Sequence, residues 1–551
     1  MNNYKRIKAA TGEEKCDLVI ENAKICDLFT HSIIEGNLGI TDGVIVGCGD
    51  YEGECRIDAK GGFVMPTFVE SHVHIESSML TPGHFARLCA VKGVTEVIAD
   101  PHEIANVAGE DGLRFMLEEA KDLPVNIHFM LPSCVPATAF DSSGAVIDAE
   151  KMKSLMGKYD FLGLGEMMNY PGVLSCERDV LEKLDTDKVI DGHAPLLSGK
   201  ALNGYAVTGI KTDHECSNTE EALDKARCGM YVLMREGSQA RDIKGLVGAV
   251  NAHTLRRFLF CTDDRYLGDI MEHGSIANCV RVAVGEGMDA LDALTIACLN
   301  PTECYNLGKR GAIAPGYNAD IMISEDITAS RITHVFKGGK LIAKDGKALF
   351  EKHSADDSRV RGSVHINPVK GEDFEIKFEK GMNAIEILPH SLLTRLYKTE
   401  DEKELNLCAV VERHKMTGNI GKCFLKGFGI RNGAIAQSIG HDSHNITVVG
   451  SDCESMAVAV NALGRDGGMS VVKEGVLKAY MPLPIAGLMS DKDEEEALRM
   501  HKEILKCAEE ISFNDEIEPF MMLSFLSLPV IPDVKINDKG LFDVKKFKYF
   551  E

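Results

Sequence analysis

Histidines and carboxylates recur at the ends of the predicted β-strands. The first of these strands ends in His72 and His74, two residues apart, so an extended backbone places both imidazoles on one face. Later strand ends carry the further candidates Glu166, His193, His214 and Asp263. Four imidazoles and two carboxylates are more than the three protein ligands of a single catalytic zinc. The set therefore favours a pair of divalent ions.

An alternation of strands and helices must position these side chains. Between residues 61 and 309 we expect eight strand–helix units, with strands ending near residues 74, 100, 131, 166, 193, 214, 235 and 264. The seventh, from Met230 to Arg235, has the weakest pattern. Eight units are typical of a (β/α)₈ TIM-like barrel of about 250 residues, in which the carboxyl ends of all strands face one mouth. All six candidate ligands would then meet there.

The flanks of this barrel predict two further units. Residues 1–60 contain short β-like pieces with turn signals at Gly36-Asn37 and Asp42-Gly43, which indicate a small and incomplete β domain. The run from Phe63 to Pro66 is interpreted as the entry to the first barrel strand. From residue 359 a polar stretch leads into mixed strands and helices, so 359–551 is predicted as a C-terminal α/β domain.

A polar run, His441 to Asn445, precedes an apolar strand of this last domain. With His414 nearby, the run is a metal candidate, although a hydrogen-bonded turn is the favoured interpretation. Because it is so polar, we also expect the C-terminal domain to help complete the active site or its lid.

Composition excludes several classes of function. The 551 residues carry 61 basic and 84 acidic side chains, a net charge of −23, so nucleic acid is a poor partner. The 17 cysteines show no C-x-x-C spacing, which indicates reduced thiols in a cytoplasm. No apolar run is long enough to cross a membrane, and the first residues show no secretory signal.

The motifs together resemble the amidohydrolase superfamily. Its pattern is H-x-H after strand one, a shared ligand after strand four, histidines after strands five and six, and an aspartate after strand eight. Residues 311–321, GAIAPGYNADI, resemble the segment by which that family returns to its small β domain, so strands up to residue 358 would complete that domain (1–60 plus 310–358). The segments HVHIESSMLTP, VIADPHEIANV, GLGEMMNYPGV, DGHAP, TDHE and TDDR resemble the adenine deaminase branch in particular. RGSVHINP and the segment ending in GHDSHNITVVG extend this resemblance over nearly the whole chain.

The resemblance implies a reaction and a ligand set. The reaction is hydrolytic deamination of adenine to hypoxanthine and ammonia, by attack of a metal-bound hydroxide at C6. The metals would be two Mn²⁺ or Fe²⁺ ions, with Zn²⁺ a further candidate. One ion would be held by His72, His74 and Asp263, the other by His193 and His214, with Glu166 binding both. Asp263 would take the proton of the hydroxide and pass it toward the departing amine. Catalytic roles therefore fall on Asp263, Glu166 and His214.

Substrate-binding candidates lie just beyond the strand ends. A small planar base calls for an apolar slot with a few donors and acceptors. The candidates are Glu76, Ser77, His102, Glu103, Ser133 and Asn169. For Asp100, His102 and Glu103 an equal alternative is that Pro101 starts a helix whose amino end the acids favour. Glu215 could orient His214 as a supporting partner.

Alternatives remain open at this point. Cyclic-amide hydrolases of the superfamily use a carboxylated lysine after strand four, and Glu166 argues against that group. Another aminated heterocycle is a second possible substrate, and a non-catalytic binding barrel should have lost some of the six ligands. The resemblance also implies purine salvage and nucleobase metabolism, adenine and water as the small-molecule partners, and a homo-oligomer, expected to be a dimer.

Overall fold

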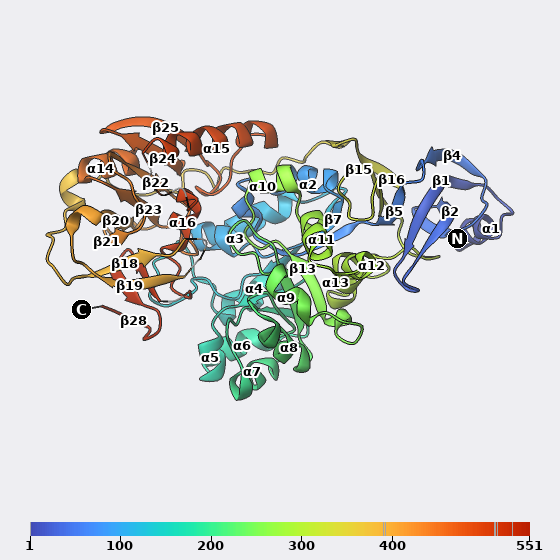
Figure 1. Ribbon diagram of the computed structural model, residues 1–551, viewed down its shortest axis with the longest axis horizontal. Helices are drawn as coiled ribbons and strands as arrows, with labels where there is room; N and C mark the ends of the chain where they lie inside the picture. The colour runs from blue at the N-terminus through green and yellow to red at the C-terminus, as the bar shows by residue number, and fades with distance from the viewer. Residues whose placement is uncertain are drawn as a thin grey trace.

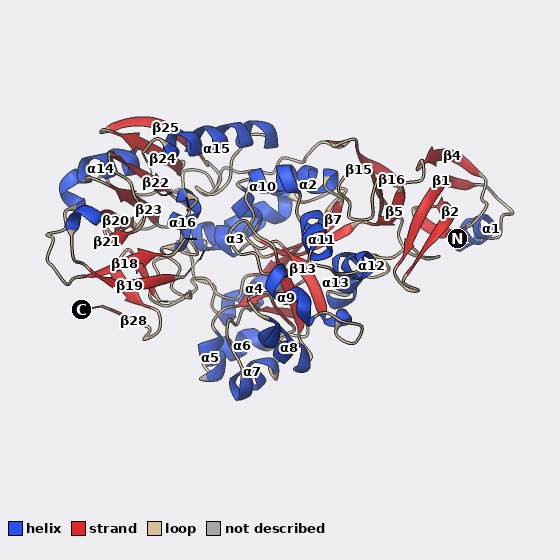
Figure 2. Ribbon diagram, in the orientation of Figure 1, coloured by secondary structure: helices blue, strands red, loops and turns tan. Residues whose placement is uncertain are grey.

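The chain has three parts arranged along its longest dimension. A computed structural model describes residues 2–389, 391, 393–511, 514, 516–531 and 533–550. A β-sheet that holds the N-terminal strands lies at one end, helices surround parallel strands in the middle, and a large sheet with the C-terminus lies at the other end (Figures 1 and 2).

Eight parallel strands form the middle part. The first five are β6 (Phe68–Val73), β7 (Val94–Ala99), β8 (Asn126–Leu131), β9 (Gly163–Met167) and β10 (Val189–Gly192), hydrogen-bonded in chain order. The other three are β11 (Thr212–Asp213), β12 (Tyr231–Arg235) and β13 (Phe258–Cys261). A parallel bridge between Val73 and Asp263 brings the ends of β6 and β13 together. A strand is therefore present at each of the eight predicted places, and β11, not the predicted seventh strand, is the shortest.

Apolar sequence explains these strands. Every residue of β6, β7, β9 and β13 is buried, as expected for parallel strands covered on both faces. The covering helices are α2 (Pro82–Val91), α3 (His102–Glu119), α4 (Ala149–Lys158), α5 (Tyr170–Leu174), α6 (Arg178–Leu184), α7 (Gly199–Ala206), α8 (Thr219–Arg227), α9 (Ile243–Leu246), α10 (Leu267–His273), α11 (Ile276–Gly285), α12 (Ala290–Leu294) and α13 (Asn300–Cys304). Among the helices of the described part of the chain, none combines the length and the apolar character that a membrane span needs.

The small sheet is built from both flanks of the middle part. Its N-terminal members are α1 (Asn2–Ala10), packed beside it, and strands β1 (Cys16–Asp27), β2 (Ser32–Thr41), β3 (Val44–Cys48), β4 (Gly53–Asp58) and β5 (Phe63–Pro66). Its later members are β14 (Ile321–Ser324), β15 (Ile332–Lys337), β16 (Lys340–Lys344) and β17 (Lys347–Ala348). Because β5 pairs with both β1 and β14, the two flanks share one sheet.

Two local predictions in this region are wrong. Phe63 to Pro66 do not enter the first parallel strand, because they form β5 of the small sheet and β6 begins afresh at Phe68. Gly36-Asn37 is not a turn, because Gly36 lies within β2 opposite Ala23, beside a shift in register. The predicted turn at Asp42-Gly43 is present between β2 and β3.

The C-terminal part is a mixed α/β unit. Its eight-stranded sheet has the order β19-β18-β21-β20-β23-β22-β24-β25. These strands are β18 (Asn383–Ile387), β19 (Thr394–Lys398), β20 (Leu405–Val411), β21 (Ile420–Lys426), β22 (Gly433–Gln437), β23 (Ile446–Gly450), β24 (Gly468–Lys473) and β25 (Val476–Pro482). Helices α14 (Cys453–Ala462), α15 (Glu494–Glu509) and α16 (Pro519–Phe525) and a small sheet of β26 (Val534–Asn537), β27 (Gly540–Asp543) and β28 (Lys548–Tyr549) complete it.

This C-terminal part contacts the middle part directly. Leu80 bridges to Ser490, and His84 of α2 bonds to the Glu494 carboxylate of α15 at 2.8 Å. One continuous hydrophobic cluster runs from the parallel strands into the C-terminal sheet. In Figure 1, α16 lies beside α3, at the carboxyl end of β7.

Candidate metal centre and substrate pocket

The six predicted ligands converge where the parallel strands end. His72 lies near the end of β6, His74 follows that strand directly, and Glu166 lies in β9. The remaining three come directly after β10, β11 and β13, namely His193, His214 and Asp263. All six side chains are buried. The structure therefore brings together residues that the sequence separates by up to 191 positions, from His72 to Asp263.

The carboxylate of Glu166 divides its two oxygens between two pairs of imidazoles. Oε1 lies 3.3 Å from His74 Nε2 and 3.9 Å from His72 Nε2, and His102 Nδ1 also lies 3.3 Å from it. Oε2 lies 2.7 Å from His193 Nδ1 and 3.2 Å from His214 Nε2. This arrangement fits a carboxylate that serves two cations at once.

Asp263 lies closest to the first of these pairs. Its Oδ1 lies 3.1 Å from His74 Nε2 and 3.4 Å from His72 Nε2. Burial alone would raise the pKa of Asp263, but the adjacent imidazoles of His72 and His74 hold it well below its usual range. The carboxylate is therefore ionised and able to bind a cation.

The tautomer of His74 indicates a positive charge between its Nε2 atom and the carboxylates of Glu166 and Asp263. Its Nδ1 lies 2.9 Å from the carbonyl oxygen of Asp100, which only accepts, so Nδ1 carries a proton. In the neutral ring, Nε2 then carries a lone pair, and this lone pair faces oxygens of both Glu166 and Asp263. A lone pair against two carboxylates is repulsive unless a proton or a metal ion lies between them.

The neighbouring imidazoles favour the metal ion. Burial, with the positive charge on His214, lowers the pKa of His72. The Nε2 atoms of His72 and His193 have no hydrogen-bond partner among the described residues. Ligand atoms of three overlapping trios lie within 4.8 Å of one another: His72–His74–Glu166, His72–His214–Asp263 and Glu166–His193–His214. Imidazole and carboxylate donors in this number fit two divalent ions.

Asp100 supports the bridging position and does not cap the helix. Its Oδ2 accepts a hydrogen bond of 2.9 Å from the backbone N–H of Glu166. A Cβ atom at Gly165 would lie 2.2 Å from that same Oδ2, so the approach requires glycine there. Helix α3 begins at His102 after Pro101, with no side-chain cap. The predicted helix start at Pro101 is therefore present, with Glu103 in the first turn, while the side chain of Asp100 contacts the backbone of Glu166.

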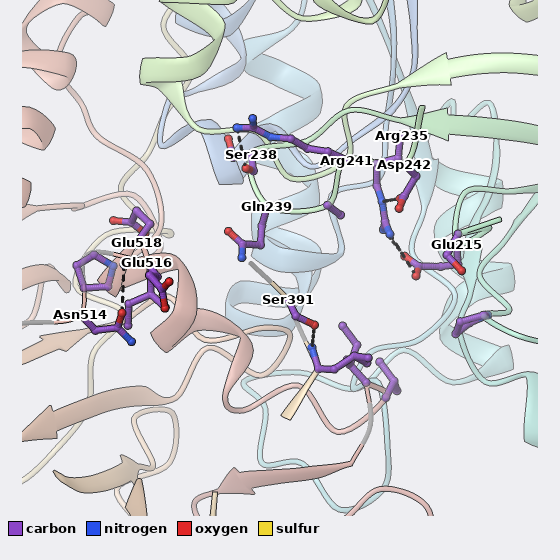
Figure 3. A pocket seen from close by; sticks show the side chains of 18 of the residues that line it. Glu215, Arg235, Ser238, Gln239, Arg241, Asp242, Ser391, Asn514, Glu516 and Glu518 are labelled. Carbon is purple, nitrogen blue, oxygen red and sulfur yellow. Dashed lines mark hydrogen bonds and ion pairs between the residues drawn. The ribbon is translucent and has the colours of Figure 1, made fainter. Parts of the chain in front are cut away.

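Arg235 was not among the residues predicted from the sequence. Its guanidinium donates to Asp263 Oδ2 at 2.9 Å and to Asp242 Oδ2 at 3.0 Å, and it also pairs with Glu215 (Figure 3). Glu215 therefore supports Asp263 through Arg235, as well as lying 3.7 Å from His214 Nε2. The only sequence signal was a buried-strand pattern that ends in a charged residue, in the strand whose pattern was weakest.

Two of the six predicted substrate contacts line the small cavity beside the ligands. This cavity, of about 40 Å³, is lined by His102 and Glu103 together with the ligands and residues of the C-terminal part. The other four candidates have protein partners. Ser133 donates to the carbonyl of Glu166, and Asn169 caps α5 by accepting from Gly172 N.

Glu76 and Ser77 do not line the small cavity, but they contact residues at or next to its wall. Glu76 Oε1 accepts from Ile104 N at 3.1 Å, and Ser77 Oγ donates to Asp264, which lines the cavity. They can influence the pocket through the backbone after Glu103 and through Asp264. A direct contact with substrate stays a prediction for all four.

The C-terminal part supplies one wall of this cavity. Its contributions are His441, Asp442, Phe525, Leu528 and Ile531. The polar run from His441 to Asn445 was the sequence signal for the first two. The three apolar residues carried no signal, because nothing local shows which surface a buried hydrophobe will meet.

A larger cavity of about 1150 Å³ adjoins the small one. It lies between the loop after β12 and the C-terminal part, and Figure 3 shows Gln239 and Arg241 facing Asn514, Glu516 and Glu518 across it. Both cavities share Glu215, Arg235, Gln239, Ala240 and Ile531. Figure 3 also shows Asp242 and Glu215 on its barrel side, so carboxylates outnumber arginines along its wall.

Comparisons with known proteins agree with this site. Residues 63–342 match the Amidohydrolase family, and residues 390–548 match the Adenine deaminase C-terminal domain. The adenine deaminase of Clostridium acetobutylicum is 44% identical over 563 residues, which cover 99% of each chain. That of Bacillus subtilis is 44% identical over 569 residues, covering 99% of this chain and 98% of the relative. The adenine deaminase 2 of Carboxydothermus hydrogenoformans is 41% identical over 98% of both. The chain therefore belongs to the adenine deaminases, a metal-dependent branch of the amidohydrolase family.

Proposed function

We propose that this enzyme converts adenine and water to hypoxanthine and ammonia at the centre formed by the six ligands. The observation that carries the proposal is the division of Glu166 between two imidazole pairs, with Asp263 closest to one of them. In this assignment His72, His74 and Asp263 hold one ion, His193 and His214 hold the other, and Glu166 holds both. Two Mn²⁺ or Fe²⁺ ions are the proposed cofactors, with Zn²⁺ as the third candidate. When bound, such ions lower the pKa of water and polarise the bond under attack.

Asp263 is the proposed proton carrier. One of its oxygens faces His72 and His74, while Arg235 holds the other, so the carboxylate has a fixed orientation. In the reaction a C6–O bond forms and the C6–N bond breaks. One proton of the attacking water passes through Asp263 to the amine, which leaves as ammonia, and the other stays on the ring of hypoxanthine. The negative charges of Glu166 and Asp263, acting against burial, raise the pKa of His214 to about 9. Positive charge is therefore favoured at this ring, and a bound cation would supply it in place of the proton.

The pocket suits a neutral base. Phe525, Leu528 and Ile531 provide an apolar wall, and His102 and Glu103 are the polar groups proposed to contact the ring. Glu76, Ser77, Ser133 and Asn169 complete the proposed substrate-binding set. Because carboxylates outnumber arginines along the larger cavity, a phosphate would meet repulsion on its way in, which disfavours nucleotides.

We further propose the architecture that this chemistry needs. Residues 61–309 form a closed (β/α)₈ barrel, residues 1–60 plus 310–358 the small β domain, and residues 359–551 the C-terminal α/β domain. The enzyme is proposed to act as a homodimer in the cytoplasm in purine salvage. Light scattering of the purified protein would measure the mass, and a monomer would contradict the dimer.

Substrate competition tests the function. Manganese-loaded enzyme is offered adenine, adenosine, AMP, dihydroorotate and hydantoin in separate reactions, with ammonia and the ultraviolet spectrum followed. Conversion of adenine to hypoxanthine far ahead of the others is expected. A preference for adenosine would move the enzyme to another deaminase branch, and ring opening of dihydroorotate or hydantoin would replace the reaction class by cyclic-amide hydrolysis.

A further inference from the structure

Glu103 of the middle part is enclosed by imidazoles, two of which come from the C-terminal part. Its side chain is 1% exposed. His441 Nδ1 bonds to Oε1 and His444 Nε2 bonds to Oε2. His102, its neighbour in the chain, lies 3.5 Å away through Nε2. A buried carboxylate with so many donors has its position set by them.

The tautomer of His444 identifies its contact as a hydrogen bond. His444 Nδ1 accepts from the backbone N–H of Gly440 at 3.2 Å, so the proton of the neutral ring is on Nε2. That proton is donated to Glu103 Oε2. A metal ion on Nε2 would need a lone pair there, which this tautomer lacks. The trio of Glu103, His441 and His444 is therefore a clamp on a carboxylate and not a third metal site.

The loop that carries both histidines is itself held from two sides. Arg413, which is fully buried, donates to the carbonyl oxygen of His444. Asn445 accepts from Arg413 N at 3.2 Å and donates to the carbonyl oxygen of Ser142, in the loop after β8, at 2.8 Å. The loop is thus fixed both to its own sheet and to the middle part, which makes it a rigid support.

His441 extends the clamp along the cavity wall. Its ring stacks on Phe525 with centroids 4.7 Å apart, and its Nε2 points to Asp264 Oδ1 at 4.0 Å. Glu103, Asp264, His441 and Phe525 all line the small cavity. The histidine therefore lies between two carboxylates of the middle part and the apolar wall of the C-terminal part.

We propose that His441 and His444 are positioning residues that hold the Glu103 carboxylate in place at the cavity wall, so that docking of the C-terminal domain assembles the substrate pocket. This inference rests on the proposed function, in which Glu103 contacts the base. It assigns the polar run from His441 to Asn445 a role in the reaction without contact with either metal ion.

Paired substitutions test the clamp. His444→Ala and His441→Ala remove the donors, whereas His444→Gln and His441→Asn each offer an amide N–H near the lost Nε2 or Nδ1 position. We expect both alanine variants to keep two metal ions per chain and to lose about 10–100-fold in kcat/KM for adenine, as supporting partners do elsewhere. The amide variants should recover most of that loss.

His84→Ala is the matched control, because it breaks another histidine–glutamate pair across the same junction, between buried His84 and partly buried Glu494, away from the cavity. It should stay close to the parent. A loss in His84→Ala as large as in the alanine variants would show that only domain docking matters and would overturn the inference. Amide variants no better than alanine, or alanine variants with parental kinetics, would also overturn it.

Crystal structures of the parent and of His444→Ala separate this inference from the proposed function. Failure of the parent to deaminate adenine would end the proposed function, whatever the clamp does. A Glu103 carboxylate in the same place in both crystal structures would end the clamp, whatever the activity. A displaced carboxylate is the expected result.

Discussion

A single carboxylate, Glu166, connects the two halves of the proposed metal centre. Each of its oxygens faces a different imidazole pair, so removing it takes one ligand from both ions. The parent should bind two divalent ions per chain, and Glu166→Ala should lose at least one of them. Metal counting by mass spectrometry measures both numbers. One ion per chain in the fully active parent would rule out the binuclear centre.

The second prediction for a single residue concerns the proton-carrier role of Asp263. The amide of Asp263→Asn keeps the shape of the side chain but cannot carry a proton. Turnover should fall by about 10²–10⁴, the usual contribution of a positioned acid–base group, while circular dichroism stays that of the parent. A variant that retains its metal and more than roughly a tenth of the parental rate would contradict the proton-carrier role.

At the scale of elements, a buried ion cluster joins β7 of the middle part to the small sheet. Glu96, 1% exposed, accepts from His128 Nε2 at 2.7 Å and pairs with Lys337 and with Arg310 Nε at 2.9 Å. Burial raises the pKa of Glu96, but the hydrogen bond from His128 and the charge on Lys337 outweigh it and lower the pKa to about 2. The ionised carboxylate is therefore strongly favoured in the folded chain.

Glu96→Gln should lower the free energy of unfolding at neutral pH by about 3 kcal/mol, because it removes the buried negative charge that faces the partly buried Lys337, Arg310 and His128. The stabilisation by Glu96 is complete above its unfolded pKa of about 4.5 and is lost as the pH falls through about 2, since the unfolded chain binds the proton first. Urea unfolding of parent and variant between pH 7 and pH 3 measures this. Glu182→Gln, in the exposed pair with Arg178, is the control and should change stability by less than about 1 kcal/mol. Equal effects of both variants would contradict the argument.

The elements also show what the sequence could and could not predict. Parallel strands buried on both faces are continuous apolar runs, so the strands from β6 to β13 and their polar ends could be predicted one by one, and with them all six candidate ligands. Phe63 to Pro66 was assigned to the wrong sheet, because an apolar sequence alone does not show which sheet a strand belongs to. Arg235 and Phe525 were missed because their roles depend on partners distant in the chain, Asp263 for one and His441 for the other.

At the scale of the whole molecule, the catalytic pocket belongs to two parts of the chain. The ligands come from the parallel strands, while one wall comes from α16 and the residues after it. A protein truncated after Arg361 should therefore lose activity with adenine even where it stays soluble and metal-loaded. Phe525→Ala in the full chain, which opens the same wall, should raise KM for adenine. A truncated protein that is soluble, metal-loaded and fully active would show that the C-terminal part is dispensable.

The shared sheet of the two flanks also has a consequence for biosynthesis. β5 is synthesised early and its partner β14 late. Pro66 can pair with Ile321 only after Ile321 has been synthesised, 255 residues later (321 − 66). At translation rates of about 5–20 residues per second, that edge of β5 stays unpaired for roughly 10–50 seconds. An open strand edge is a template for pairing with other chains. The nascent protein therefore passes through an aggregation-prone interval while the middle part is being synthesised, and this interval is the natural point for a chaperone to act.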